Sequence, residues 1–143
     1  MKRSHLITAI AVPLAAAILY LSQRPAATDS ALPPAPGAPL VQVTVPDTLS
    51  AQAKLGKTAF EAVCAACHGD KADGRNEMGP PLIHKIYEPS HHGDAAFFRA
   101  AALGVRAHHW PFSDMPPQSH LTRAEVQSII TYLRAVQRAN GIH

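Results

Sequence analysis

Two cysteines and a histidine stand together near the middle of the chain, in the string Cys64-Ala65-Ala66-Cys67-His68. They are the only cysteines among the 143 residues. This CxxCH spacing is typical of covalent c-type haem attachment. Two thiols one helical turn apart can each add to a vinyl group on one edge of a porphyrin, and the imidazole that follows can reach the iron. The string therefore predicts Cys64 and Cys67 as covalent tethers and His68 as one axial iron ligand.

Two other kinds of site also use cysteine pairs. A thiol redox pair belongs to a βαβ context, whereas the segments that flank this string have helical patterns. A zinc site needs about four ligands, and no second CxxC is present to complete one. Attachment of haem is therefore the interpretation that the residues favour.

A helix is expected on each side of the haem-attachment string. The first is capped by Ser50 or Thr48 and runs to about Cys67. Apolar residues recur in it at steps of three and four, which predicts a buried face made of Leu55, Ala59, Ala62 and Val63. The last begins at the capping box Thr122–Glu125 and ends at Asn140-Gly141, after about 17 residues. Its apolar stripe is Val126, Ile129, Ile130, Leu133 and Val136.

A shorter helix is expected over residues 94–103, with Gly104 after it and long Pro- and Gly-containing loops around it. No segment of this region has a good strand pattern. A helical domain of this size with such long loops has a thin core of its own. A large, flat, apolar prosthetic group at its centre supplies the missing interior.

Residues 1–23 carry a membrane-targeting pattern. Lys2 and Arg3 precede an uncharged run, residues 6–21. Sixteen helical residues span about 24 Å, short of the roughly 30 Å hydrocarbon core, but including Ser4, His5 and Ser22 brings the span to about 28 Å. Length alone therefore does not separate an anchor from a signal peptide. Because residues 19–24 offer a poor cleavage site, we expect an uncleaved inner-membrane anchor with a periplasmic domain. The alternative is cleavage, which leaves a soluble periplasmic protein.

Residues 24–46 are rich in proline and almost free of charge, which predicts a linker between the anchor and a haem domain over residues 47–143. The alternative is an ordered arm packed on the domain, because Val41, Val43 and Val45 alternate like a short strand. The whole chain carries a formal charge of +3. From residue 47 onward the chain has ten basic and nine acidic side chains, so its near-neutral charge gives no support for nucleic-acid binding.

Residues 48–140 resemble class I c-type cytochromes in an ordered set of motifs. After the CxxCH string come Gly79-Pro80-Pro81-Leu82 and then a lone methionine in Ser113-Asp114-Met115-Pro116-Pro117. The resemblance implies an all-α fold, in which three to four helices with long loops wrap around one covalently attached haem c. It also implies a close crossing of the first and last helices, with Gly56 or Phe60 against Tyr132.

The resemblance carries further roles onto matching residues. The carbonyl of Pro80 would accept a hydrogen bond from the imidazole of His68 and fix its orientation. Leu82 would pack on the haem face. Trp110 and Arg106 are candidates for hydrogen bonds to the haem propionates, with packing as the alternative for Trp110 and solvent exposure for Arg106.

The sixth iron ligand has several candidates, and Met115 is the one we expect. It lies 47 residues beyond His68, far enough for the chain to wrap over the opposite haem face. His108 and His109 are the main alternatives, because they are close enough in sequence to compete for that face. The other candidates are Met78, His84, His91, His92 and His120. Of these, the pair His91-His92 is expected in a solvated loop.

A His/Met pair leaves haem iron with no open position, and the soft thioether raises its potential. We therefore expect an electron-transfer protein and not an enzyme, a monohaem carrier that meets redox partner proteins at an exposed haem edge as a monomer or a subunit of a redox complex. The alternative is the electron-entry subunit of a larger oxidoreductase. A third hypothesis is a haem peroxidase or gas sensor, in which Met115 dissociates and His108 and His109 act as acid/base groups.

Overall fold

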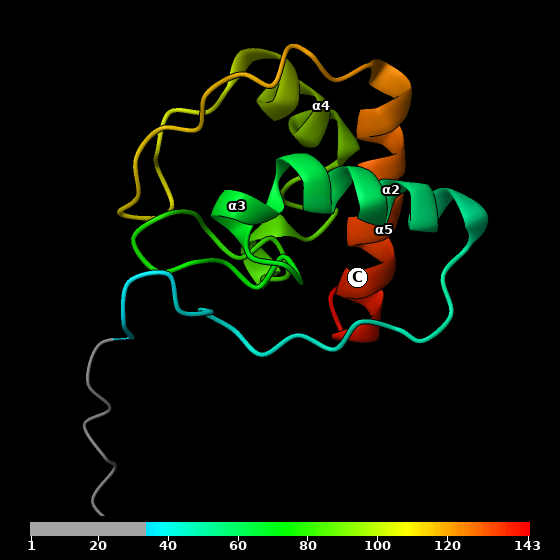
Figure 1. Ribbon diagram of the computed structural model, residues 1–143, viewed down its shortest axis with the longest axis horizontal. Helices are drawn as coiled ribbons and strands as arrows, with labels where there is room; N and C mark the ends of the chain where they lie inside the picture. Colours follow the sequence, from blue (N-terminus) through cyan, green and yellow to red (C-terminus); the bar gives the residue numbers. More distant parts are fainter. Residues whose placement is uncertain (1–33) are drawn as a thin grey trace, which may run out of the picture. The chain divides into compact units, whose positions relative to one another are not determined.

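The computed structural model describes residues 34–143 (Figure 1). The predicted anchor over residues 1–23 and the first part of the predicted linker, residues 24–33, lie outside the described residues. Between residues 34 and 143, none of the helices has the length and apolarity that a membrane crossing requires. The elements in chain order are α2 (Ala51–Val63), α3 (Ala65–His68), the 3-10 helix η1 (Lys85–Tyr87), α4 (Asp94–Leu103) and α5 (Arg123–Ala139).

The predicted all-α fold is confirmed. In the part of the chain that the structure describes, the only β-type pairings are two isolated bridges, Arg75 with Gly79 and Val105 with Met115. The short helix expected over residues 94–103 is α4, which has the same bounds and is followed by Gly104 at its C-cap. Long loops join the helices, as the proline and glycine content predicts (Figure 1).

The C-terminal helix α5 follows its sequence pattern closely. Its N-cap, Thr122, accepts a hydrogen bond from the N–H of Glu125, and the Glu125 carboxylate accepts one from the N–H of Thr122. This reciprocal pair satisfies two N–H groups that a helix start leaves free. The buried side of the helix contains the whole predicted stripe, Val126, Ile129, Ile130, Leu133 and Val136.

Helices α2 and α5 cross at close range (Figure 1). The contact depends on Gly56, because a Cβ atom there would overlap the backbone carbonyl of Ser128 on α5. One turn further along α2, the ring of Phe60 packs against that of Tyr132, with centroids 5.7 Å apart. Both rings are fully buried. The predicted glycine and aromatic crossing is confirmed, with Gly56 set against the α5 backbone and Phe60 against Tyr132.

The predicted buried face of the first helix is confirmed only in part, because Ala59 and Val63 are half-buried but Leu55 and Ala62 are exposed. Leu55 is 67% exposed, whereas the buried residues of α2 are Ala53, Gly56 and Phe60. These three also recur at steps of three and four, and the close approach at Gly56 turns this stripe of small residues and one ring toward α5. The helix also ends earlier than predicted, at Val63, and a separate turn, α3, carries the end of the CxxCH string.

Residues 34–46 of the predicted linker lie against the domain, and Figure 1 shows this arm in cyan passing the C-terminal end of α5. The side chain of Asn140 exchanges two hydrogen bonds with the backbone of Thr44, at 2.9 and 2.7 Å. Val43 and Val45 pack against the hydrophobic core. These contacts agree with the alternative interpretation of residues 34–46, an ordered arm packed on the domain.

Candidate haem-binding site

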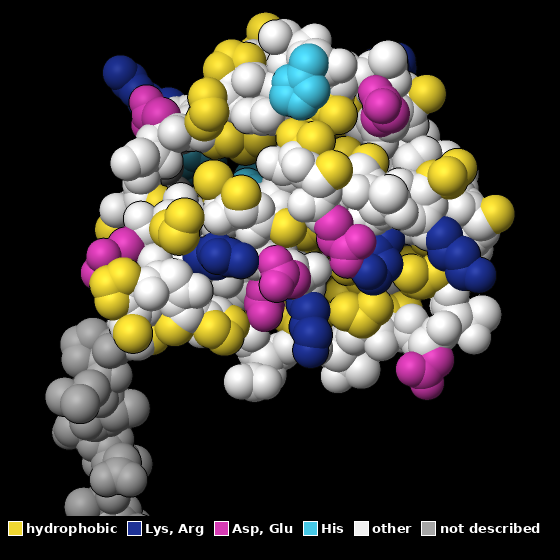
Figure 2. All heavy atoms as spheres, viewed as in Figure 1, with side chains coloured by type: hydrophobic (Ala, Val, Ile, Leu, Met, Phe, Trp, Pro, Cys, Tyr) yellow, Lys and Arg dark blue, Asp and Glu magenta, His cyan; other side chains and the backbone are white. Residues whose placement is uncertain are grey.

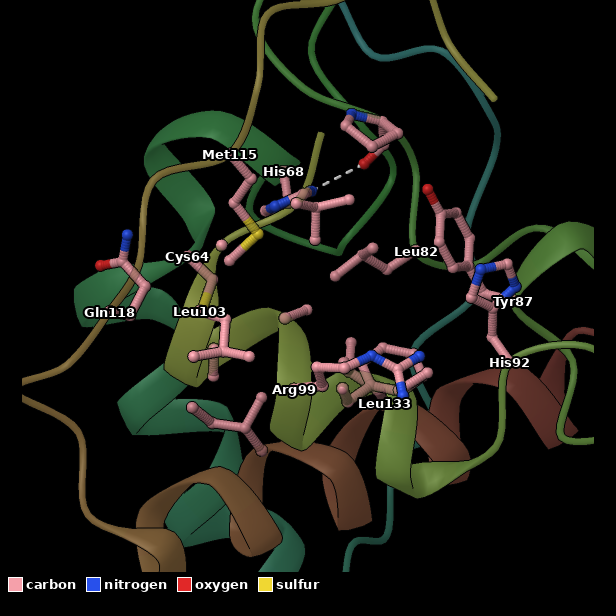
Figure 3. A pocket seen from close by; sticks show the side chains of 18 of the residues that line it. Cys64, His68, Leu82, Tyr87, His92, Arg99, Leu103, Met115, Gln118 and Leu133 are labelled. Atoms are coloured by element: carbon pink, nitrogen blue, oxygen red, sulfur yellow. Dashed lines mark hydrogen bonds between the residues drawn. The ribbon is translucent and has the colours of Figure 1, made fainter. Parts of the chain in front are cut away.

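A cavity of about 450 Å³ lies among the helices and is closed on one side by the loop between α4 and α5 (Figure 3). Its volume falls in the range typical of small-molecule and cofactor sites. Its wall is mainly apolar, and residues from α2, α4, α5 and the loops contribute to it. Among them are Leu82, Leu103, Val105, Ile129 and Leu133.

His68 lies at the end of α3 and lines this cavity while being only 8% exposed. Its Nδ1 lies 2.9 Å from the carbonyl oxygen of Pro80, drawn as the dashed line in Figure 3. Because a carbonyl only accepts, Nδ1 carries the proton and Nε2 is left with a free lone pair. Burial lowers the pKa of His68, and the Pro80 hydrogen bond opposes that shift only in part. The ring is therefore a neutral, oriented imidazole with one nitrogen available as a ligand.

The turn that supplies the Pro80 carbonyl is pressed against the CxxCH string. A Cβ on Gly79 would lie 2.6 Å from the carbonyl oxygen of Cys67, which is too close for any other residue. The N–H of Arg75 donates to the carbonyl of Gly79 at 2.9 Å and closes the same loop. Glycine at position 79 thus allows the approach that the resemblance assigns to this turn.

The two cysteines have different surroundings. Cys64 lies between α2 and α3 and lines the cavity, whereas Cys67 is exposed and is not among the lining residues. Burial, and to a smaller extent the charge of the nearby Cys67, raises the pKa of Cys64 to about 11. Redox cysteine pairs work through thiols whose pKa is lowered, so this environment disfavours the thiol redox alternative.

Met115 reaches the same cavity from the loop that follows α4 (Figure 3). Its backbone exchanges two hydrogen bonds of 2.9 Å with Val105, which fixes the position of the loop. Gly104 has a φ of +74°, and a Cβ there would lie 2.5 Å from the Met115 carbonyl oxygen. On the far side of Met115, the N–H of Gln118 donates to the carbonyl of Ala101 at 2.7 Å. The sulfur is therefore presented by a segment held at both ends.

The remaining predicted contacts of the haem, Leu82, Trp110 and Arg106, also line the cavity. Trp110 Nε1 is buried and has no hydrogen-bond partner among the described residues. A buried donor without a partner is costly, so this atom points to an acceptor that a bound group brings. Arg106 is exposed.

The other candidates for the sixth ligand divide into two groups. Met78 is 48% exposed and does not line the cavity, and neither do His84, His91 and His120. His92, His108 and His109 do line it. Among the candidate alternatives to Met115, the geometry therefore leaves these three histidines, which border the same cavity.

Arg134 on α5 is a structural centre that no sequence expectation included. It is only 8% exposed, and each of its three guanidinium nitrogens donates at least one hydrogen bond. It donates to Asp94 Oδ1 at 2.9 Å and to the carbonyls of Tyr87 and His92 at 2.8 and 2.6 Å. The buried side chain of Gln137 accepts a further bond from it. Arg134 thereby fixes the segment between η1 and α4, which forms part of the cavity wall.

Comparison with known proteins assigns the family. The sequence model of cytochrome c matches residues 53–137. The chain belongs to the cytochrome c family. Over 50 residues it is 42% identical to a cbb3-type cytochrome c oxidase subunit, FixPc, from Rhizobium leguminosarum bv. viciae, a match that covers 35% of this chain and 17% of the relative.

A solved structure, cytochrome CL from the marine methylotrophic bacterium Methylophaga aminisulfidivorans, superposes with a TM-score of 0.48 and 30% sequence identity. The superposition covers 60% of this chain and 55% of that one. The match spans only part of the length of each of these two proteins.

The cofactor follows from the family, as the CxxCH string predicts: one covalently bound haem c. The residues present fit this group. An apolar cavity has Cys64 and His68 on its wall, and Trp110 Nε1 is a buried donor that lacks a partner among the described residues. The class I cytochrome c interpretation of the sequence is thus confirmed.

Proposed function

We propose that this cytochrome c is a monohaem one-electron carrier in which His68 and Met115 are the axial ligands and Cys64 and Cys67 the covalent tethers. One observation carries the proposal. His68 and Met115 come from segments far apart in the chain and line one apolar cavity. A haem held between these two side chains has no vacant iron position, which suits electron transfer and not substrate chemistry.

The chain's own residues prepare this site in three ways. The Pro80 carbonyl keeps the Nδ1 proton of His68 in place, so that Nε2 faces the cavity as a ligand. The Val105 bridge and Gly104 hold the Met115 segment in position. The mainly apolar wall favours burial of a flat apolar group over water. When bound, the haem supplies an iron that takes up and releases one electron.

Redox partners would meet this protein at the open side of the cavity. Leu103 lines the cavity and is 72% exposed, so it offers apolar contact there. Figure 2 shows basic and acidic side chains interspersed on the visible face, in line with the ten basic and nine acidic residues from position 47 onward. Small mixed surfaces of this kind suit brief encounters between redox proteins.

The proposed location is the periplasmic side of the inner membrane, with residues 1–23 as an uncleaved anchor. The support is the sequence alone, Lys2 and Arg3 before the uncharged run and the poor cleavage site after it. Mass spectrometry of the exported protein tests this point. An intact N-terminus agrees with the anchor, and a new N-terminus near residue 18 or 28 contradicts it.

Carbon monoxide binding tests the carrier proposal against the peroxidase or gas-sensor hypothesis. We expect the reduced, full-length, haem-loaded protein to bind little carbon monoxide at neutral pH, because Met115 occupies the sixth position. The variant Met115→Ala should bind it rapidly and serves as the positive control. Rapid and complete binding by the unaltered protein contradicts a firmly held methionine.

A second candidate function is the electron-entry subunit of a larger oxidoreductase. The observation that favours it is the 42% identity over 50 residues to a subunit of a cbb3-type cytochrome c oxidase. Purification in mild detergent separates the two candidates. A stable complex of fixed stoichiometry supports the subunit, and an isolated monomer supports the carrier.

A further inference from the structure

Three histidines that the proposed His68 and Met115 ligation leaves free gather at one edge of the cavity, where His92 and His109 border it and His91 lies outside its lining. His91 and His92 lie in the turn before α4, and His109 lies in the loop after it. One ring nitrogen from each of the three lies within 4.8 Å of the others. The ring centroids of His91 and His92 are 5.5 and 5.2 Å from that of His109. Two segments that are far apart in sequence therefore bring their imidazoles together.

His92 is already oriented as a metal ligand needs to be. Its Nδ1 lies 2.6 Å from the carbonyl oxygen of Ile86, so Nδ1 donates a proton there and Nε2 is left free. Its own carbonyl accepts a bond of 2.6 Å from buried Arg134. Metal-binding histidines characteristically have their second nitrogen bonded to a carbonyl or carboxylate in this way. His92 is thus a fixed point, set by α5, around which the other two rings can close.

The distances suit a transition metal after a small movement. Imidazole nitrogens bind Zn²⁺ at about 2.0–2.1 Å, which places two nitrogens of a tetrahedral site about 3.3 Å apart. His91 and His109 are exposed, so rotation of their side chains can bring nitrogens now within 4.8 Å to that separation. The ring of His108 lies 4.2 Å from that of His109, and its Nδ1 bonds the carbonyl of Arg106 at 2.8 Å. It stands beside the three as a fourth imidazole.

We propose that His91, His92 and His109 form a binding site for one divalent transition-metal ion, separate from the haem iron. Imidazole ligands select ions of the Zn²⁺, Cu²⁺ and Ni²⁺ group over Mg²⁺ and Ca²⁺, which prefer oxygen. The ion joins the turn before α4 to the loop that carries Trp110 and Met115. A bound metal therefore ties together two parts of the wall of the haem cavity.

Calorimetric titration of Zn²⁺ into the full-length, haem-loaded protein tests this site. We expect one equivalent of Zn²⁺ to bind. His91→Ala should weaken Zn²⁺ binding by about tenfold or more, because the loss of even a hydrogen-bond partner of a metal ligand lowers metal affinity by about 10- to 100-fold. His91 is exposed and does not line the cavity, so its variant leaves the haem site intact. His120→Ala removes an exposed histidine outside the cluster and is the matched control, with no change expected.

Thermal unfolding gives a second readout. Saturating Zn²⁺ should raise the unfolding midpoint of the unaltered protein and of His120→Ala but not that of His91→Ala, because the ion binds only where both folded segments are in place. The proposal is overturned if Zn²⁺ does not bind or if His91→Ala binds it unchanged. It is also overturned if His120→Ala loses as much affinity as His91→Ala, since binding is then distributed over surface histidines.

Discussion

The substitution Gly56→Ala tests the helix crossing that supports the haem cavity. A Cβ at this position would overlap the Ser128 carbonyl on α5, and the N–H nitrogen of Ile129 would lie only 2.9 Å from it. Atoms in ordinary contact lie about 3.5–4.0 Å apart. These neighbours are backbone atoms in the middle of a helix, so they cannot move aside alone. The two helices must separate, and the packing of Phe60 on Tyr132 loosens with them.

Two opposing effects set the magnitude. Alanine improves helix propensity by about 1 kcal/mol over glycine. Overpacking a well-filled core costs about 1–3 kcal/mol and sometimes more, and a clash between two helix backbones belongs at the upper end. We therefore expect Gly56→Ala to lower the free energy of unfolding by about 2 kcal/mol. At about 4–8 °C per kcal/mol for a domain of this size, the melting temperature falls by roughly 10 °C.

Denaturant unfolding of the haem-loaded protein, followed by circular dichroism and haem absorbance, measures this change. The control is Thr58→Ala, an exposed position on the same helix. It brings a similar gain in propensity without a clash and should be neutral or slightly stabilising. If Gly56→Ala proves as stable as Thr58→Ala, the close approach of α2 to α5 is not what holds this core together.

Three further changes test other parts of the account. Arg134→Ala should cost about 2 kcal/mol in denaturant unfolding, because it removes the donor to the partly buried carbonyl of His92 and one of the two donors to that of Tyr87. Exposed Arg138→Ala should stay within about 0.5 kcal/mol. Equal effects of the two substitutions contradict the structural role of Arg134. Tyr132→Phe should stabilise the protein by up to about 1 kcal/mol at pH 8, because the buried hydroxyl has no hydrogen-bond partner among the described residues. Burial, followed by Glu61 and Asp73, raises the pKa of Tyr132 to about 12, so above pH 10 the unfolded chain releases a proton that the folded chain keeps. The difference in free energy of unfolding between Tyr132→Phe and the unaltered protein should therefore grow by about 1.4 kcal/mol between pH 8 and pH 11. A difference that stays constant over this range contradicts the raised pKa of Tyr132. Thr122→Ala removes the capping box of α5 and should cost about 1 kcal/mol in the same assay; no loss would mean that tertiary packing alone fixes that helix start.

The elements that local chemistry determines were predictable. The capping box at Thr122 and the apolar stripe after it define α5, and the structure has the same start and buries all five residues of that stripe. The CxxCH string and the ordered motifs beyond it led to the fold and to one covalently bound haem c. In these cases the signal lies in short strings of neighbouring residues and in their order along the chain, so no distant contact was needed to interpret them.

Features that depend on distant contacts were harder to predict. The sequence pattern predicts a buried face of α2 made of Leu55, Ala59, Ala62 and Val63. Leu55 is instead 67% exposed, because the crossing at Gly56 selects the face. Arg134 stands four residues after Ile130 on the buried stripe of α5, a charged residue where an apolar one is expected. That position was a signal for a buried network. Apart from Gln137, however, its partners lie in residues 87–94, at least 40 residues earlier, and no local pattern identifies them.

The histidine cluster shows the same difference between local and distant information. His91 and His92 were expected in a solvated loop, and nothing next to them in the sequence indicates His109 as a neighbour. The fold of α4 against α5 brings the two segments together, and Arg134 fixes the carbonyl of His92 within it. The cluster therefore became visible only when the tertiary structure was known.

The absorption spectrum of the ferric protein tests the central claim, that Met115 is the second axial ligand, most directly. We predict a sulfur-to-iron charge-transfer band in the unaltered protein and its loss in Met115→Ala. Met78→Ala is the matched control, because Met78 is 48% exposed and does not line the cavity, and it should keep the band. An unchanged spectrum in Met115→Ala would contradict the account and assign the sixth position to a histidine at the cavity wall.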